Sequence, residues 1–126
     1  MFISSRQFAD VILIKVEGRI ADNKTAKDFE NALNPFLNAC FTGEYQKILL
    51  DFEGLDLITS AGLRVLMIVA KTCEKQETEI VVAALQPIIE NIFKISRFDS
   101  LITIFPTVKS ALESMSHTAA DLYISI

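Results

Sequence analysis

The sequence predicts an α/β fold in one domain, with a mostly parallel central sheet of about five strands, an N-terminal hairpin and four helices. Short runs of β-branched and aliphatic residues alternate along the chain with longer segments whose apolar residues recur at helical spacing. Strands that are joined through helices imply right-handed crossovers and parallel pairing. The chain has 126 residues, 51% of them hydrophobic, which suits a single domain with a proper core.

The predicted strands are short apolar runs bounded by turn residues. The first two form a hairpin through Ala9 and Asp10, and Gly18 ends the second. Residues 48–50 are an unbroken apolar run, which is typical of a central strand buried on both faces. The expected strands are residues 2–8, 11–16, 47–52, 79–85 and 101–105.

The predicted helices lie between these strands and after the last of them. Asp22 offers an N-cap to the first helix, and Pro35 should kink or split that helix near Asn34. The helix that starts at Ser60 is apolar almost all round in its first half, so it must be well buried. A proline in the first turn opens each of the last two helices. The expected helices are residues 23–40, 60–76, 87–96 and 106–116.

We expect residues 1–116 to form the domain and residues 117–126 to be a C-terminal tail. Leu122, Ile124 and Ile126 alternate with other residues in this tail. The pattern is compatible with an added edge strand, a swapped arm or disorder.

Composition narrows the classes of partner. The formal net charge is −4 and there is no basic cluster, which disfavours nucleic acid and anionic membranes as partners. No apolar run approaches the roughly 20 residues that span a bilayer, and the N-terminus lacks a signal-peptide pattern. Cys40 and Cys73 fall in predicted helices without paired spacing, as small buried residues in a reducing compartment would. We therefore expect a cytoplasmic location.

The most unusual stretch lies where a strand of the predicted sheet ends, at the edge where ligands of such sheets gather. Ser60 is a natural N-cap, because its hydroxyl can accept a hydrogen bond from the amide of Gly62 or Leu63. Gly62 costs about 1 kcal/mol relative to Ala at an interior helix position, and it would let another backbone approach closely. The helix start also suits an anion. The alternative is that Ser60 is only a cap and Gly62 only a packing glycine.

This stretch resembles the STAS domain family, the domain of bacterial anti-sigma factor antagonists and of sulfate transporter tails. The likeness extends to residues 16–26 and 98–112, and it covers roughly residues 3–116. Its most specific part is the helix start read with the preceding strand. The matching residues are Leu50-Asp51, Gly54-Leu55, Leu57-Ile58 and Thr59-Ser60-Ala61-Gly62-Leu63.

The resemblance implies a protein-binding switch that needs no cofactor and no metal. Free-standing members of the family bind an anti-sigma factor that is also a serine kinase of the GHKL type. Phosphorylation of the serine that matches Ser60 breaks the complex, and a PP2C-type phosphatase reverses it. Thr59 stands where many members carry Asp, and the loop after Gly18 is one residue longer. The partner-binding residues that the resemblance implies are Asp22, Asp56, Thr59, Ser60, Ala61, Gly62, Leu63 and Arg64.

Other functions fit less well. A phosphate-accepting receiver domain needs an acidic pair after its first strand, which is missing here, although Asp51 could mimic its aspartate. An enzyme is disfavoured because His117 lies in the expected solvated tail, and no nucleophile, base and orienting group fall together. Asp51, Glu53 and Asp56 could suggest Mg²⁺, but loop carboxylates are more often solvated. Within the STAS family, the alternative is a scaffold or ligand-sensing module without phosphorylation.

Overall fold

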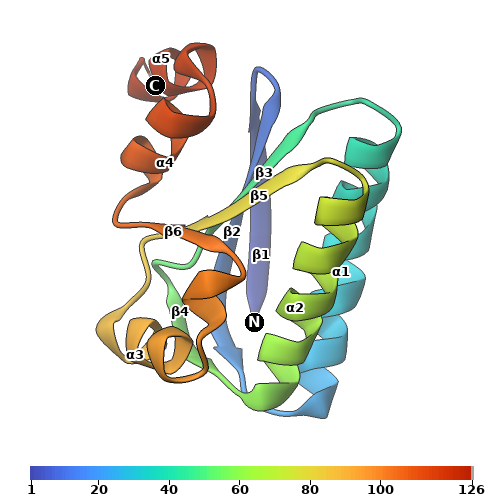
Figure 1. Cartoon of the computed structure of the whole chain (residues 1–126), viewed down its shortest axis with the longest axis vertical. Coiled ribbons are helices and arrows are strands. Elements are labelled where there is room, and N and C mark those ends of the chain that lie inside the picture. The colour runs from blue at the N-terminus through green and yellow to red at the C-terminus, as the bar shows by residue number, and fades with distance from the viewer. Residues whose placement is uncertain (126) are drawn as a thin grey trace.

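A computed structural model describes residues 1–125 and contains a six-stranded sheet (Figure 1). Five strands follow the order β1-β2-β3-β5-β6, and β4 pairs with the far end of β2. Within residues 1–125 only β1 and β2 pair antiparallel, so the expected N-terminal hairpin and mostly parallel sheet are confirmed. The strands are β1 (Phe2–Phe8), β2 (Val11–Ile20), β3 (Lys47–Asp51), β4 (Leu55–Ile58), β5 (Glu79–Ala83) and β6 (Thr103–Phe105).

Helices cover both faces of the sheet. Two of them, α1 and α2, pack on one face, and α4 and α5 pack on the other; α3 lies beside β4 (Figure 1). Ile48 and Leu50 of β3 join the core under α1 and α2, whereas Leu49 joins the core under α4. This confirms that β3 is a central strand buried on both faces. The helices are α1 (Asn23–Phe41), α2 (Ser60–Lys75), α3 (Pro87–Ile95), α4 (Val108–Met115) and α5 (His117–Ile124), with a 3₁₀ turn at Phe98–Ser100.

Strand β2 does not end at Gly18, and the stretch between the expected strand 47–52 and the expected helix 60–76 contains the additional strand β4. Gly18 has φ 101°, and its N–H donates to the carbonyl of Gly54 at 2.9 Å. Beyond Gly18 the strand pairs with β4 until Ile20 lies opposite Ile58. The register shift leaves Asp56 of β4 as an extra, bulged residue. Gly18 therefore marks the point in β2 at which its pairing changes from β3 to β4.

Helix α1 is a single helix that runs through Pro35, so the expected split near Asn34 is wrong. Pro35 is exposed, and a proline removes only one backbone donor. Phe29, Leu33 and Leu37 are buried on both sides of it and hold the two halves against the same core. Cys40 of α1 and Cys73 of α2 are buried and free, and burial raises the pKa of their thiols to about 12 and about 11. This confirms them as buried structural residues.

Two boundaries near the C-terminus differ from the expectation. Strand β6 starts at Thr103, because a 3₁₀ turn and the bend after it occupy the preceding residues. Helix α4 starts at Val108 and not at Pro106, because Thr107 caps it reciprocally with Ser110.

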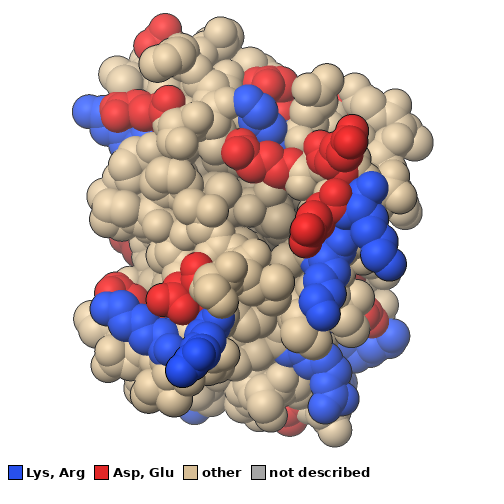
Figure 2. All heavy atoms as spheres, viewed as in Figure 1, with Lys and Arg blue, Asp and Glu red and all other residues tan. Residues whose placement is uncertain are grey.

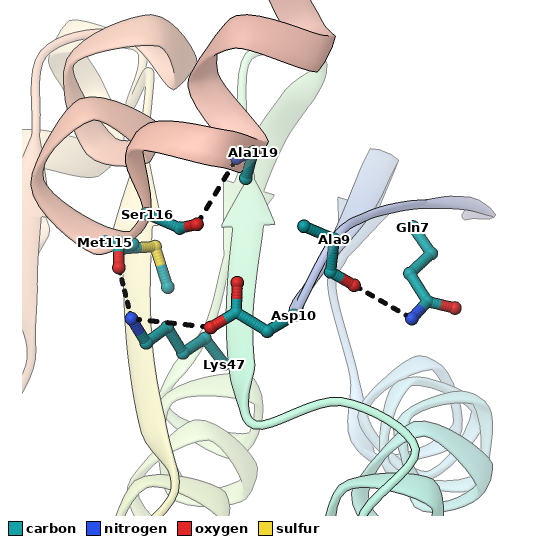
Figure 3. Close-up of polar contacts among 7 residues, drawn as sticks. All are labelled: Gln7, Ala9, Asp10, Lys47, Met115, Ser116 and Ala119. Carbon is teal, nitrogen blue, oxygen red and sulfur yellow. Dashed lines mark hydrogen bonds and ion pairs between the residues drawn. The ribbon is translucent and has the colours of Figure 1, made fainter.

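The C-terminal segment is a helix, so an added edge strand is wrong and residues 1–125 contain five α-helices instead of four. The hydroxyl of Ser116 accepts a hydrogen bond from the N–H of Ala119 at 3.3 Å and caps α5 (Figure 3). Lys47 donates to the carbonyl of Met115 and lies 3.6 Å from Asp10, which ties the end of α4 to the start of β3 (Figure 3). Ile126 of the alternating pattern lies outside the described residues.

Candidate functional site

The junction of β4 and α2 carries the residues that the sequence singled out. Thr59 is extended, with φ −93° and ψ 176°, and its N–H donates to the carbonyl of Ile20 at 3.0 Å. Its own carbonyl accepts from the N–H of Leu63 at 2.9 Å, the first bond of the helix. Thr59 is therefore the N-cap and Ser60 the first helical residue, which corrects the expected cap at Ser60. The hydrogen bond to Ile20 holds Thr59 in an extended conformation, so Thr59 is the cap of a helix that begins at Ser60 as expected.

The hydroxyl groups of Thr59 and Ser60 lie in opposite environments. The Oγ1 atom of Thr59 is buried and has no hydrogen-bond partner within residues 1–125. The side chain of Ser60 is exposed to solvent. Of these two neighbouring hydroxyls, only that of Ser60 is within reach of another protein.

The helix start around Ser60 suits a negative group. The N–H groups of Ser60, Ala61 and Gly62 precede the first helical hydrogen bond, and no acidic residue lies in the first turn of α2. Arg64 is exposed four residues after Ser60, so both side chains lie on the same face of the helix. An anion on the Ser60 hydroxyl would meet these amides and a guanidinium group.

Gly62 is a packing glycine of the chain itself. A Cβ atom at this position would lie 2.7 Å from Cγ2 of Ile20 and 2.8 Å from Cγ1 of Ile58. The missing side chain lets the first turn of α2 sit directly on β2 and β4. Within the described chain, the close approach at Gly62 is therefore made by these two side chains and not by another backbone.

Asp22 and Ser60 lie at the same edge of the sheet. Ile20 pairs with Ile58, and Asp22 and Ser60 each follow two residues later, where α1 and α2 begin side by side (Figure 1). The Asp22 carboxylate accepts from the N–H and the hydroxyl of Thr25, both at 2.8 Å, so Asp22 caps α1 as expected. The backbone hydrogen bond from Thr25, followed by that of its hydroxyl, lowers the pKa of Asp22 and keeps the exposed carboxyl ionised.

Gln86 is a residue of this region that sequence reasoning missed. Its Nε2 atom donates to the carbonyl of Glu53 at 2.8 Å and to Oδ1 of Asp56 at 3.1 Å. It thereby ties the start of α3 to the bulge of β4 and fixes the exposed carboxylate of Asp56. The only signal in the sequence is a glutamine directly before Pro87, which nothing local connects to Asp56.

The acidic residues of this edge do not gather into a metal site. Asp51 is only 6% exposed, it accepts from the N–H of Glu53 at 3.0 Å, and burial raises its pKa. Asp56 is held by Gln86 instead. Within residues 1–125 no three His, Cys, Asp or Glu side chains are grouped to hold a metal ion.

The surface charge is mixed. On the face drawn in Figure 2, basic and acidic side chains are interspersed over a largely uncharged surface. None of the helices in residues 1–125 has the length and apolar character needed to cross a bilayer.

Comparison with known proteins places this geometry in a family. Residues 3–111 match the family model of the STAS domain, and the chain belongs to that family. The sequence resemblance is thus confirmed, and so is the fold that it implied.

One curated relative and several solved structures are similar to this chain. BtrV of Bordetella bronchiseptica, named as an anti-sigma factor antagonist, is 40% identical over 65 residues. This match covers 52% of the chain and 53% of BtrV, about half of each protein. An anti-sigma factor antagonist from Mycobacterium paratuberculosis superposes with a TM-score of 0.72 at 24% identity, covering 90% of this chain and 92% of that one. Phosphorylated SpoIIAA of Bacillus gives a TM-score of 0.67 at 16% identity, covering 91% and 100%.

Proposed function

We propose that this chain is an anti-sigma factor antagonist whose binding to an anti-sigma factor is switched off by phosphorylation of Ser60. The observation that carries the proposal is the exposed hydroxyl of Ser60 at the first position of α2, next to a threonine whose hydroxyl is buried. Membership of the STAS family and the name of the BtrV relative support the antagonist role.

The proposed partner-binding surface surrounds this hydroxyl. Its exposed members are Asp22, Asp56, Ser60 and Arg64, and the half-buried Ala61 and Leu63 lie between them. The hydroxyl of Thr59 and the backbone of Gly62 are buried, so they shape this surface from below instead of contacting the partner.

The switch follows from what each side can accommodate. A phosphate group adds about −1.5 to −2 charges and three acceptor oxygens. The start of α2 accepts these with free amides, and Arg64 can pair with them, so the domain stays folded. A partner surface that covers the hydroxyl would have to bury this charge without compensation, which is costly. Phosphorylation therefore abolishes binding and leaves the fold intact.

The proposed partners follow the same logic. The family resemblance implies that the anti-sigma factor is itself a serine kinase of the GHKL type, and such a partner would cover and modify the same exposed hydroxyl. A PP2C-type phosphatase restores the free hydroxyl, which is exposed enough for a second enzyme to reach.

Phosphate mapping tests the site. A GHKL-type serine kinase that binds the purified chain, incubated with it and Mg-ATP, should add one phosphate, and mass spectrometry should place it on Ser60. The Ser60→Ala chain is the control and should take up none. A phosphate on Thr59, or none at all, would contradict the assignment.

Binding to the same purified kinase tests the switch. Ser60→Ala should bind as the wild type does, whereas Ser60→Asp should bind much more weakly at an unchanged melting temperature. Equal binding of both variants would favour a scaffold module of the same fold, in which Ser60 is not a switch.

A further inference from the structure

The two outer strands of the β1-β2-β3-β5-β6 path differ in how well their open edges are protected. Strand β6 forms one edge, is only three residues long and is followed directly by Pro106, which has no N–H to donate. Strand β1 forms the other edge with seven residues, and within the described chain it pairs with β2 alone. It contains no proline and one charged residue, Arg6. A long edge strand without such protection presents unpaired N–H and C=O groups to another chain.

One face of β1 is apolar at both ends, but only one end is covered. Phe8 is 3% exposed, and its ring meets that of Tyr123 edge-to-face at 5.7 Å between centroids, under α5. Phe2 lies on the same face, since successive side chains of a strand alternate, and it is 69% exposed. The other face of β1 carries Ile3, which packs against the main core.

We propose that β1 pairs with β1 of a second copy of this chain, antiparallel and about a two-fold axis at Ser5. This register pairs all seven residues of the strand with their symmetry mates. It places Ser5 opposite Ser5 of the second copy, and Phe2 opposite the covered Phe8. The two β-sheets then continue as one across the axis.

Self-complementarity selects a second copy as the occupant. The exposed Phe2 of each copy would lie beside the Phe8–Tyr123 pair of the other, within the 4.5–5.5 Å that separate facing Cβ atoms. The symmetry makes this contact twice. A single two-fold axis therefore covers both exposed phenylalanines and pairs both open edges, which an unrelated partner would do only by coincidence.

The proposed interface is small, so we expect a weak and reversible dimer. An edge-to-edge contact of seven residues lies at the low end of protein interfaces, where complexes are transient. Each Arg6 faces Ser4 of the second copy and lies diagonal to the other Arg6. Their guanidinium groups repel weakly, which adds to the expectation of a modest affinity.

Cysteine cross-linking tests both the partner and the register. In the proposed dimer the two Ser5 Cα atoms are about 4.5–5.5 Å apart, within the range that a disulfide spans. Ser5→Cys should therefore give a covalent dimer on mild oxidation. Ser4→Cys is the matched control, because its two thiols lie on diagonal positions about 7–8 Å apart. Ser4→Cys should give no covalent dimer on oxidation. The wild type should give none either, because Cys40 and Cys73 are buried.

Equal cross-linking of Ser4→Cys and Ser5→Cys, or no cross-linking of Ser5→Cys, would overturn the register. Sedimentation equilibrium provides a second measurement, in which the wild type should approach dimer mass as its concentration rises. Ser5→Lys, which sets two like charges across the axis, should remain monomeric with an unchanged circular dichroism spectrum. A wild type that stays monomeric, or that grows beyond two copies as pairing of β1 with β6 would allow, contradicts the proposal.

Discussion

Two neighbouring hydroxyl groups, those of Thr59 and Ser60, lie where β4 meets α2, and their environments differ. Thr59 continues the strand ladder to Ile20 and buries its Oγ1 atom without a partner, whereas Ser60 begins the helix and is exposed. The backbone of Thr59 positions Ser60, but its hydroxyl makes no hydrogen bond within the described chain. At the scale of single residues, the site combines one exposed hydroxyl with one buried hydroxyl that lacks a partner within the described chain.

Thr59→Val tests the energetic cost of that buried hydroxyl. An unpaired buried hydroxyl costs about 1–3 kcal/mol, and valine fills the same space without a polar atom. We expect the free energy of unfolding, measured by urea denaturation, to stay level or to rise. Thr59→Ser, which keeps the hydroxyl, should not gain stability. A clear loss in Thr59→Val alone would mean that the hydroxyl has a partner, such as a bound water.

The buried carboxyl of Asp51 predicts a pH dependence. Burial raises its pKa above the ordinary value of 3.8, so near that pH the folded state binds more protons than the unfolded state. Stability should therefore fall as pH rises from the ordinary pKa through the raised one. Asp51→Asn keeps an acceptor for the N–H of Glu53, and it should flatten this slope and raise stability at neutral pH.

Asp51→Ala is the control for this prediction. It removes the charge together with the acceptor, so it leaves the N–H of Glu53 unpaired and should lose stability at every pH. Melting temperatures between pH 3 and pH 7 distinguish the two variants. An unchanged slope in Asp51→Asn would show that other groups cause the pH dependence.

At the scale of elements, the site depends on how closely α2 approaches the β2–β4 pair. Gly62 puts the first turn of the helix directly against Ile20 and Ile58. The glycine in β2 at position 18 and the bulge at Asp56 bring β4 into register beneath that turn. Gln86 then connects the bulge to the start of α3.

Gly62→Ala should disturb this approach. Its Cβ atom would lie under 3 Å from both isoleucines, and overpacking of this kind costs about 1–3 kcal/mol. Ser60→Ala, the matched control two residues earlier, changes an exposed side chain and should unfold as the wild type does. Urea denaturation of the two variants measures the difference. Equal stability would show that the overpacking costs no more than the gain in helix propensity of about 1 kcal/mol.

At the scale of the whole molecule, helix α5 is part of the packed structure. Ala119 and Ala120 are buried in the core that lies between the sheet and helices α4 and α5, and Tyr123 packs on Phe8 of β1. We propose that the folded unit extends beyond the expected boundary at residue 116 and includes this helix.

Tyr123→Ala tests the role of α5. It removes an edge-to-face aromatic pair worth about 0.5–1.5 kcal/mol and the area that the ring buries. Leu122→Ala is the control, because Leu122 is an exposed neighbour on the same helix. Thermal unfolding should give a lower melting temperature for Tyr123→Ala but not for Leu122→Ala. The samples are kept dilute so that the proposed dimer does not contribute. Equal melting of both variants would make α5 a dispensable tail.

Much of this fold could be predicted from the sequence because most of its strands and helices have a clear local sequence pattern. Strand β3 is an unbroken apolar run, and Asp22 caps α1 as its sequence suggests. Strand β4 was not predicted, because it is four residues long and its bulge interrupts the alternation of inward and outward side chains. Helix α5 escaped because it packs through small alanines, and its larger apolar residues alternate as those of a strand do.

The candidate site was predicted in outline, and its details were not. The motif around Ser60 is local, and the structure places it at an accessible helix start. Long-range contacts decide the rest. The pairing of Ile20 with Ile58 sets the cap at Thr59, packing against the same two residues explains Gly62, and Gln86 reaches Asp56 from 30 residues away.

The most direct test of the central claim is the dissociation constant of the partner kinase for the chain before and after phosphorylation of Ser60, with the melting temperature measured on both forms. We predict that phosphorylation raises the Kd by about a hundredfold or more, because an uncompensated buried charge costs several kcal/mol and about 1.4 kcal/mol corresponds to a factor of ten. The melting temperature should hold or rise. An unchanged Kd, or a phosphorylated chain that unfolds, would contradict the account.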